Sequence, residues 1–180
     1  MKGVVFTEFF SMVEEVFDAD MVDHLIEATN PSSLGAYTSV GSYDYAELEA
    51  MVVELSSVSK MEIETLLTAF GKHLGAQFAT NYTSFFTTAG DTYSLLKQID
   101  QHIHVEVRKL YPDAELPEFD FIQSSENDLL LKYRSTRPLA DLAHGLILQT
   151  AQYFGENLTV EMHKWQEDEW HKCDFTLTKS

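Results

Sequence analysis

The sequence has 180 residues, the length of one globular domain, and can bury most of its apolar surface without disulfides or metals. Asp and Glu number 29 against 12 Lys and Arg, which gives a formal net charge of −17. This charge disfavours nucleic acid and anionic membrane surfaces as partners, because both are bound through Lys and Arg. The single cysteine, Cys173, excludes an internal disulfide framework and an all-cysteine metal site.

The first residues lack the pattern of a secretory signal, because the acidic Glu8 falls where such a signal needs a long apolar stretch. No run approaches the roughly 18 apolar residues of a membrane span. We therefore expect a soluble protein of a reducing compartment, the cytoplasm, with no nucleic-acid or membrane partner.

The first part of the chain has helical periodicity. Apolar residues spaced by three and four predict a helix over 4–17, a second through 21–26 after a cap at 18–20, and a third over 45–55. Ser59 and Glu62 have the spacing of a capping box ahead of a helix over 63–78. A break at 89–91 precedes a long predicted helix over 92–110, which Tyr111 and Pro112 end.

The second part changes to the period of strands. Runs at 118–122 and 129–135 predict a hairpin, and runs at 158–162 and 173–178 predict a strand pair around an acidic turn at 166–169. A helix is expected over 139–154. The sum is one α+β domain over 1–180. A helical subdomain, about 1–65, packs on a mixed α/β subdomain, about 66–180, which holds a small antiparallel sheet and helices.

Two of the seven histidines, His102 and His104, share a predicted helix. They lie about 200° apart around the helix axis, so they cannot bind one metal ion from the same face. His104 is the better candidate to face inward, because Val107 and Tyr111 continue its stripe toward the core. A lone imidazole in an apolar cavity can hold an iron whose equatorial ligands come from a porphyrin.

A second candidate site is the row Tyr133, Ser135 and Arg137. On a strand these side chains point to one face and span about 13 Å. A phenol, a hydroxyl and a guanidinium suit carboxylates or phosphate. The alternative is a solvated edge strand whose arginine pairs with one of the many acids. Two of only three arginines, Arg134 and Arg137, lie here in a strongly acidic chain.

The pattern Tyr-x-Ser-x-Arg resembles the propionate-binding signature of the H-NOX (heme nitric oxide/oxygen binding) domain. Other segments that resemble the family are the start Met1–Val5, the run His104-Val105-Glu106-Val107 followed by Tyr111-Pro112, and Pro117-x-Phe119. The chain's full length and its order of helices before sheet also resemble this domain. It is similar to a stand-alone bacterial member, related to the sensor domain of soluble guanylate cyclase.

The resemblance implies a heme b between the two halves, with His104 as the axial iron ligand. It assigns the two propionates to Tyr133, Ser135 and Arg137. By the same resemblance, Pro117 presses on the heme and distorts it, and Val5 and Leu146 line its pocket.

The resemblance also bears on the gas. Relatives that bind oxygen stably use a distal tyrosine supported by a tryptophan and an asparagine, and the matching positions here are Leu142, Phe9 and Leu74. None of the three carries a hydrogen-bond donor for bound O₂. We therefore expect a sensor selective for nitric oxide, which also binds CO and excludes O₂.

The expected mechanism is that nitric oxide weakens the bond from iron to His104, so that the heme relaxes and the helix of His104 shifts. The resemblance implies a histidine kinase or a cyclic-di-GMP enzyme as the partner in trans. The chain itself is not expected to be an enzyme, because it has no Gly-x-Ser-x-Gly, P-loop or His-Glu-x-x-His pattern.

Two other functions remain open at this point. One is a heme enzyme of peroxidase or dioxygenase type, which would need a distal acid–base residue, with His73 as the nearest candidate. The other is a non-heme acidic interaction domain. A zinc site of Cys173 with His163 and His171 is a weak tetrahedral set.

Overall fold

The computed structural model describes all residues except 100–103, 111 and 113. Its helices are α1 (Gly3–Val16), α2 (Ala19–Thr29), α3 (Tyr45–Ser59), α4 (Ile63–Asn81), α5 (Thr83–Ala89), α6 (Thr92–Gln98), α7 (His104–Leu110) and α8 (Ala140–Phe154). Its strands are β1 (Glu118–Gln123), β2 (Asp128–Ser135), β3 (Leu158–Glu167) and β4 (Trp170–Lys179). The strands form one antiparallel sheet in the order β1-β2-β4-β3. The predicted α+β fold is confirmed.

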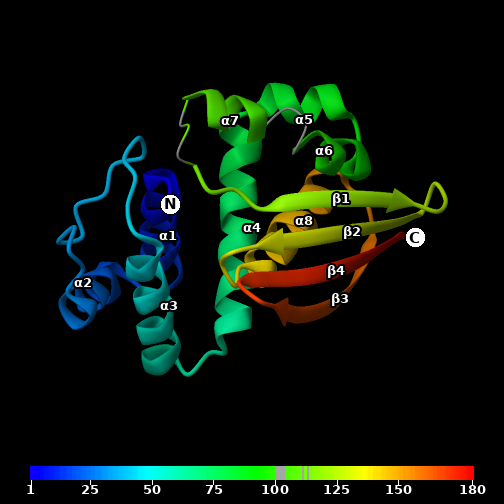
Figure 1. The fold of residues 1–180 in the computed structure, drawn as a ribbon. Helices are drawn as coiled ribbons and strands as arrows, with labels where there is room; N and C mark the ends of the chain where they lie inside the picture. The colour runs from blue at the N-terminus through cyan, green and yellow to red at the C-terminus, as the bar shows by residue number, and fades with distance from the viewer. Residues whose placement is uncertain (100–103, 111, 113) are drawn as a thin grey trace.

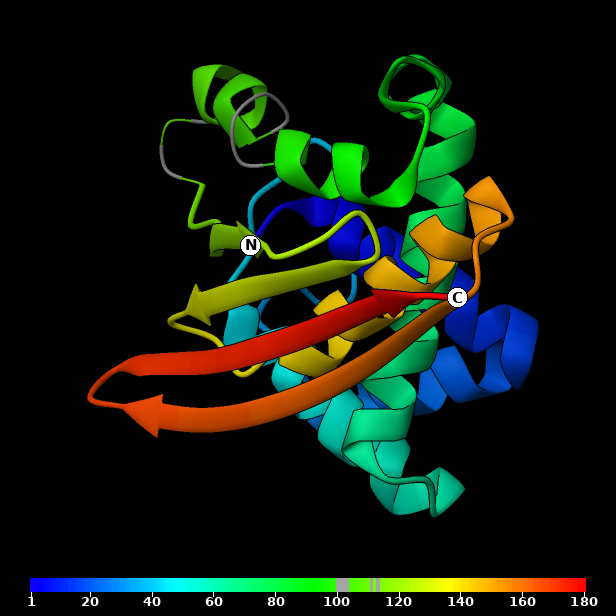
Figure 2. The same cartoon turned by 90° about the vertical axis from the view of Figure 1, so that its right-hand side faces the viewer.

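The elements form two halves on either side of α4 (Figure 1). Helices α1, α2 and α3 lie on one side, and α8 with the sheet lies on the other. One face of the sheet covers α8, and none of the helices that the structure describes lies on the opposite face (Figure 2). None of the helices in the described part of the chain combines the length and the hydropathy needed to cross a bilayer.

Three helices are capped at their N-terminus by an aspartate. Its short side chain can accept a hydrogen bond from a backbone amide of the first turn, which has no partner within the helix. Asp18 accepts a hydrogen bond from the Met21 amide at 2.8 Å, and Asp44 and Asp91 cap α3 and α6 in the same way. The predicted capping box is wrong. Ser59 is the last residue of α3, because the left-handed Lys60 (φ 60°) ends that helix before α4 begins. Glu62 precedes α4 without a side-chain cap.

Two other expectations differ from the structure. The region 83–89, for which no element was expected, forms the helix α5. Its one buried residue is Phe86, and a single buried residue gives no periodic pattern in the sequence. The single helix expected over 92–110 is described as α6, which is followed by Ile99, and as α7. Residues 100–103, which include His102, lie outside the described residues.

Helices α4 and α8 pack closely because glycines meet backbone at their crossing. A Cβ atom on Gly145 would lie 2.1 Å from the carbonyl oxygen of Thr68, and one on Gly71 would lie 2.1 Å from that of Leu142. Neither carbonyl oxygen can move away from an added methyl group unless its whole helix moves. Helices α4 and α8 are therefore joined by a contact that tolerates no side chain.

We predict that Gly145→Ala lowers the free energy of unfolding by about 1–3 kcal/mol, because the methyl group forces α4 and α8 apart. Urea denaturation measures this loss. Gly75→Ala is the matched control, since its methyl group meets side-chain atoms instead of backbone, those of Gln149 at 3.0 Å and of Leu146 at 3.6 Å. An equal loss in both variants would show that helix crossing is not the cause.

The loop between α2 and α3 is held by one carboxylate. Glu47 accepts hydrogen bonds from the Ser33 hydroxyl at 2.6 Å and the Tyr37 hydroxyl at 2.7 Å, and also from the Ser32 hydroxyl and the Ser33 amide. Burial alone would raise the pKa of Glu47, but these hydrogen bonds outweigh it and lower the pKa to about 2. The ionised form is thus the one that stabilises the loop.

We predict that Glu47→Gln lowers the free energy of unfolding by about 1 kcal/mol at pH 7. Hydrogen bonds to a charged group contribute more than this when buried, but Glu47 is partly exposed and solvent weakens them. Because the folded pKa lies below the unfolded value of about 4.3, this contribution is complete above that pH. It is lost as the pH falls toward 2. Chemical denaturation between pH 7 and 3 should show the two proteins converging, and a constant difference would contradict the assignment.

Candidate heme site

The end of β2 carries the predicted anion-binding row. Tyr133 and Ser135 point inward and are 4% and 8% exposed, whereas Lys132 and Arg134 on the same strand are exposed. This alternation is the expected one for a strand with one buried face. Arg137 is not on the strand, because β2 ends at Ser135. It stays beside the row, since its backbone N–H donates to the Ser135 hydroxyl at 3.1 Å.

The guanidinium of Arg137 lies in a semi-enclosed position. It donates to the Glu115 backbone oxygen at 3.2 Å, pairs with the Glu115 carboxylate, and lies 5.5 Å from the ring centre of Tyr45. Its side chain is 14% exposed, against 69% for that of Glu115. Pairing with acids is therefore observed, as it is between Arg134 and Glu118. The Glu115 carboxylate that pairs with Arg137 is exposed to solvent, so it can move away and a carboxylate of a ligand can take its place.

Tyr133 is a hydrogen-bond donor at neutral pH. Burial raises the pKa of its phenol to about 12, while the Ser135 hydroxyl and the Arg137 guanidinium act in the opposite direction. The group therefore keeps its proton under physiological conditions. A phenol, a hydroxyl and a guanidinium thus converge at one end of β2 and can bind a carboxylate together.

His104 is the first residue of α7 and lies beside the same strands. Its ring stacks on Phe119 of β1, with ring centres 5.7 Å apart, and Phe119 lies 5.8 Å from the ring of Tyr133, its partner in the β1–β2 register. Pro117 is partly buried just before β1 begins. The stacking on Phe119 positions the imidazole near the anion-binding row. Sequence reasoning missed Phe119, although it lies in the segment Pro117-x-Phe119.

The five apolar residues expected to line the pocket come from three helices and lie in one core cluster. Phe9, Leu74 and Leu142 are buried, from α1, α4 and α8 respectively, and Val5 and Leu146 are partly buried against them. Their side chains offer no hydrogen-bond donor. A ligand held among them would meet an apolar surface.

His73, next to Leu74 on α4, is engaged elsewhere. Its Nε2 lies 3.2 Å from the Glu8 carboxylate, and its Nδ1 lies 3.6 Å from that of Glu15, both on α1. Both ring nitrogens therefore face carboxylates of α1. This imidazole is not available as an acid–base group for the apolar cluster.

The residues of this site suit a metal ion that is already bound in an organic cofactor. In the described residues, no group of three His, Cys, Asp or Glu side chains lies close enough to hold a metal ion. Cys173 is completely buried, and burial raises the pKa of its thiol to about 12, so it is a poor metal ligand. An iron in a porphyrin needs only an axial imidazole, for which His104 suffices, and its carboxylates match the row at the end of β2.

Comparison with known proteins agrees with this arrangement. The model of the haem-NO-binding family matches residues 2–162. The unliganded Fe(II) H-NOX protein from K. algicida is 35% identical, with a TM-score of 0.93, over 100% of this chain and 97% of that one. The Fe(II)NO H-NOX protein from S. oneidensis is 28% identical, with a TM-score of 0.90, over 100% and 99%.

A more distant structure shares the fold alone. It is an oxygen-binding H-NOX domain related to soluble guanylate cyclases, 18% identical with a TM-score of 0.86, over 100% of this chain and 95% of that one. Among curated proteins, the comparison found no match.

Proposed function

The chain belongs to the haem-NO-binding (H-NOX) family of heme-binding gas sensors, and we propose that it senses nitric oxide, also binds CO and excludes O₂. The observation that carries this proposal is the apolar cluster, in which Phe9, Leu74 and Leu142 are at most 8% exposed. Bound O₂ carries partial negative charge and needs a donor, whereas nitric oxide binds ferrous heme strongly without one. The S. oneidensis relative in its Fe(II)NO state supports the same ligand.

We propose heme b as the cofactor, held through side chains from both halves of the fold. His104 would be the axial ligand, and Tyr133, Ser135 and Arg137 would hold the propionates. The remaining contacts would come from Pro117 on the His104 side and from Val5, Phe9, Leu74, Leu142 and Leu146 on the gas side. The low exposure of the Arg137 side chain supports this, because a desolvated guanidinium binds a carboxylate strongly.

The proposed signal starts at His104. When bound, the heme would supply an iron that His104 holds, and nitric oxide binding to this iron would weaken its hold on His104. His104 begins α7, so its release frees this helix from a fixed point beside β1. The helical subdomain, about 1–65, then shifts against the mixed subdomain, about 66–180. A ligand moves such an equilibrium only through different affinities for its two states, and the His104 bond supplies that difference.

We propose that the receiver is a histidine kinase or a cyclic-di-GMP enzyme in a bacterial cytoplasm, and that the chain has no catalytic activity of its own. The engagement of His73 by Glu8 and Glu15 supports a sensor over a peroxidase or dioxygenase, which would need a free distal base. The family match weighs against a non-heme interaction domain.

The test is the absorption spectrum of the purified ferrous protein, with and without nitric oxide and in air. We expect a Soret band that shifts to a five-coordinate nitrosyl form, and no stable oxygen spectrum. A stable oxygen complex in air would contradict the selectivity. Protein that cannot be loaded with heme would contradict the sensor function as a whole.

A further inference from the structure

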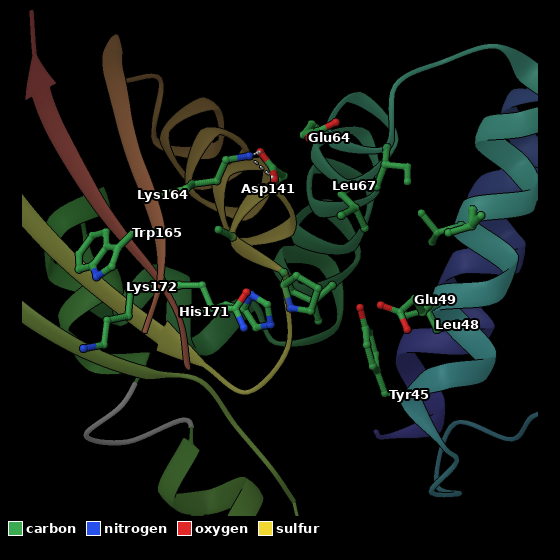
Figure 3. Close-up of a pocket in the computed structure, with 17 residues that line it drawn as sticks. Tyr45, Leu48, Glu49, Glu64, Leu67, Asp141, Lys164, Trp165, His171 and Lys172 are labelled. Atoms are coloured by element: carbon green, nitrogen blue, oxygen red, sulfur yellow. Dashed lines mark hydrogen bonds and ion pairs between the residues drawn. The ribbon is translucent and has the colours of Figure 1, made fainter. Parts of the chain in front are cut away.

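A cleft of about 360 Å³ lies between the two halves of the fold, and its lining includes none of the residues assigned to the heme (Figure 3). One wall is formed by α3 and α4, and the other by the start of α8 and the ends of β3 and β4, which together form a hairpin. We call it the hairpin cleft. Buried apolar side chains contribute to its lining: Leu48, Val52, Leu67 and Leu139. Its volume is within the range of ligand-binding pockets.

Exposed apolar residues gather at this cleft. Val53 on α3, Ile63 on α4 and Trp165 on β3 line it and are 51%, 37% and 39% exposed. Single exposed apolar residues are ordinary on a protein surface, but several around one concave site mark a place where another molecule binds.

Three carboxylates and two lysines line the cleft. Glu49 and Glu64 lie on the helical wall, and Asp141 lies on the opposite wall, where Lys164 pairs with it at 2.9 Å (Figure 3). The second lysine, Lys172, pairs with Glu167. The carboxylates of Glu49 and Glu64 thus leave the helical wall acidic, in a chain whose net charge is −17.

We propose that the hairpin cleft docks a cationic segment of a partner protein that carries apolar anchor side chains. Apolar anchors would enter between the walls, and lysines or arginines would meet Glu49 and Glu64. A second copy of the chain fits poorly, because two chains of charge −17 repel each other. The proposal deepens the proposed function and rests on it for the existence of a receiving partner.

The cleft is connected to the anion-binding row. Tyr45 lines the cleft, and its ring lies 5.5 Å from the guanidinium of Arg137. Pro138 and Leu139, which follow Arg137 in the chain, also line it. Helix α3 belongs to the helical subdomain, whereas α8, β3 and β4 belong to the mixed subdomain, so a shift between the two subdomains changes the width of the cleft. Nitric oxide and the docked segment should therefore alter each other's affinity reciprocally.

The test uses a fluorescein-labelled helical peptide with leucines at i, i+3, i+4 and i+7 and lysines elsewhere, titrated with the heme-loaded protein by fluorescence anisotropy. Val53→Gln and Ile63→Gln should weaken binding by at least about tenfold, because each removes an apolar contact without changing the charge of the cleft. Ile122→Gln is the matched control, since it makes the same kind of replacement at a 53% exposed position on β1 outside the cleft. It should leave the affinity unchanged.

Charge is tested separately. Replacing Glu49 and Glu64 together by glutamine should weaken binding by about fivefold, whereas Glu161→Gln on β3 should have no effect. A peptide with glutamates in place of lysines should bind at least about tenfold more weakly. Unfolding in urea checks that each variant remains folded.

Absence of peptide binding, or equal losses in Val53→Gln and Ile122→Gln, would overturn the docking proposal. Nitric oxide spectra of the same samples separate the two hypotheses. A normal response to nitric oxide without cleft-specific binding would overturn the docking site alone. Cleft-specific binding without a response to nitric oxide would overturn the proposed sensor function alone.

Discussion

His104→Gly is expected to lose heme affinity by more than about 100-fold, because changing a residue that merely orients a metal ligand already costs about 10- to 100-fold. No set of three metal-binding side chains in the described part of the chain can replace this imidazole. Added imidazole should restore the Soret band of the variant, since it can occupy the space left beside Phe119. The heme-to-protein absorbance ratio, with and without imidazole, is the measurement.

The imidazole-rescued variant also tests the route of the signal. Its iron ligand is no longer joined to α7, so nitric oxide should bind but should not change the activity of the partner protein. His163→Ala, which removes an exposed histidine of β3, should behave like the wild type in both assays. A rescued His104→Gly protein that still transmits the nitric oxide signal would contradict the proposed route.

Most of the fold could be predicted from periodicity, because its long elements each bury one face. The helix ending at Val16 and the hairpin of β1 and β2 are examples in which apolar spacing matches the observed element. The errors have local causes. Strand β3 extends to Glu167, beyond its apolar part, because backbone pairing with β4 continues through the polar residues before the turn.

The candidate site could be predicted only in part. The inward direction of Tyr133 and Ser135 follows from strand alternation, which is a local property. The contacts of Arg137 with Glu115 and Tyr45 depend on segments that are distant in sequence or outside regular elements, and no periodic pattern reports them. Phe119 is a similar case, because its stacking on His104 depends on how α7 lies against β1.

Leu142→Tyr is expected to convert the apolar cluster into one that retains oxygen. Leu142 is 8% exposed and packs in the same cluster as Phe9 and Leu74, so a phenol there would add a hydrogen-bond donor beside two residues that carry none. A hydrogen bond to a charged or strongly polar acceptor contributes about 1.5–3 kcal/mol, which corresponds to about 10- to 100-fold in oxygen affinity. Absorption spectra of the ferrous protein in air measure the change.

Leu142→Phe is the matched control, because it adds the same ring without the hydroxyl. Overpacking should cost both variants about 1–3 kcal/mol of stability, so the difference between them isolates the hydrogen bond. Binding of nitric oxide should persist in both, since it does not depend on a donor. An oxygen complex of equal lifetime in the two variants would mean that steric access, rather than the missing donor, excludes oxygen from this protein.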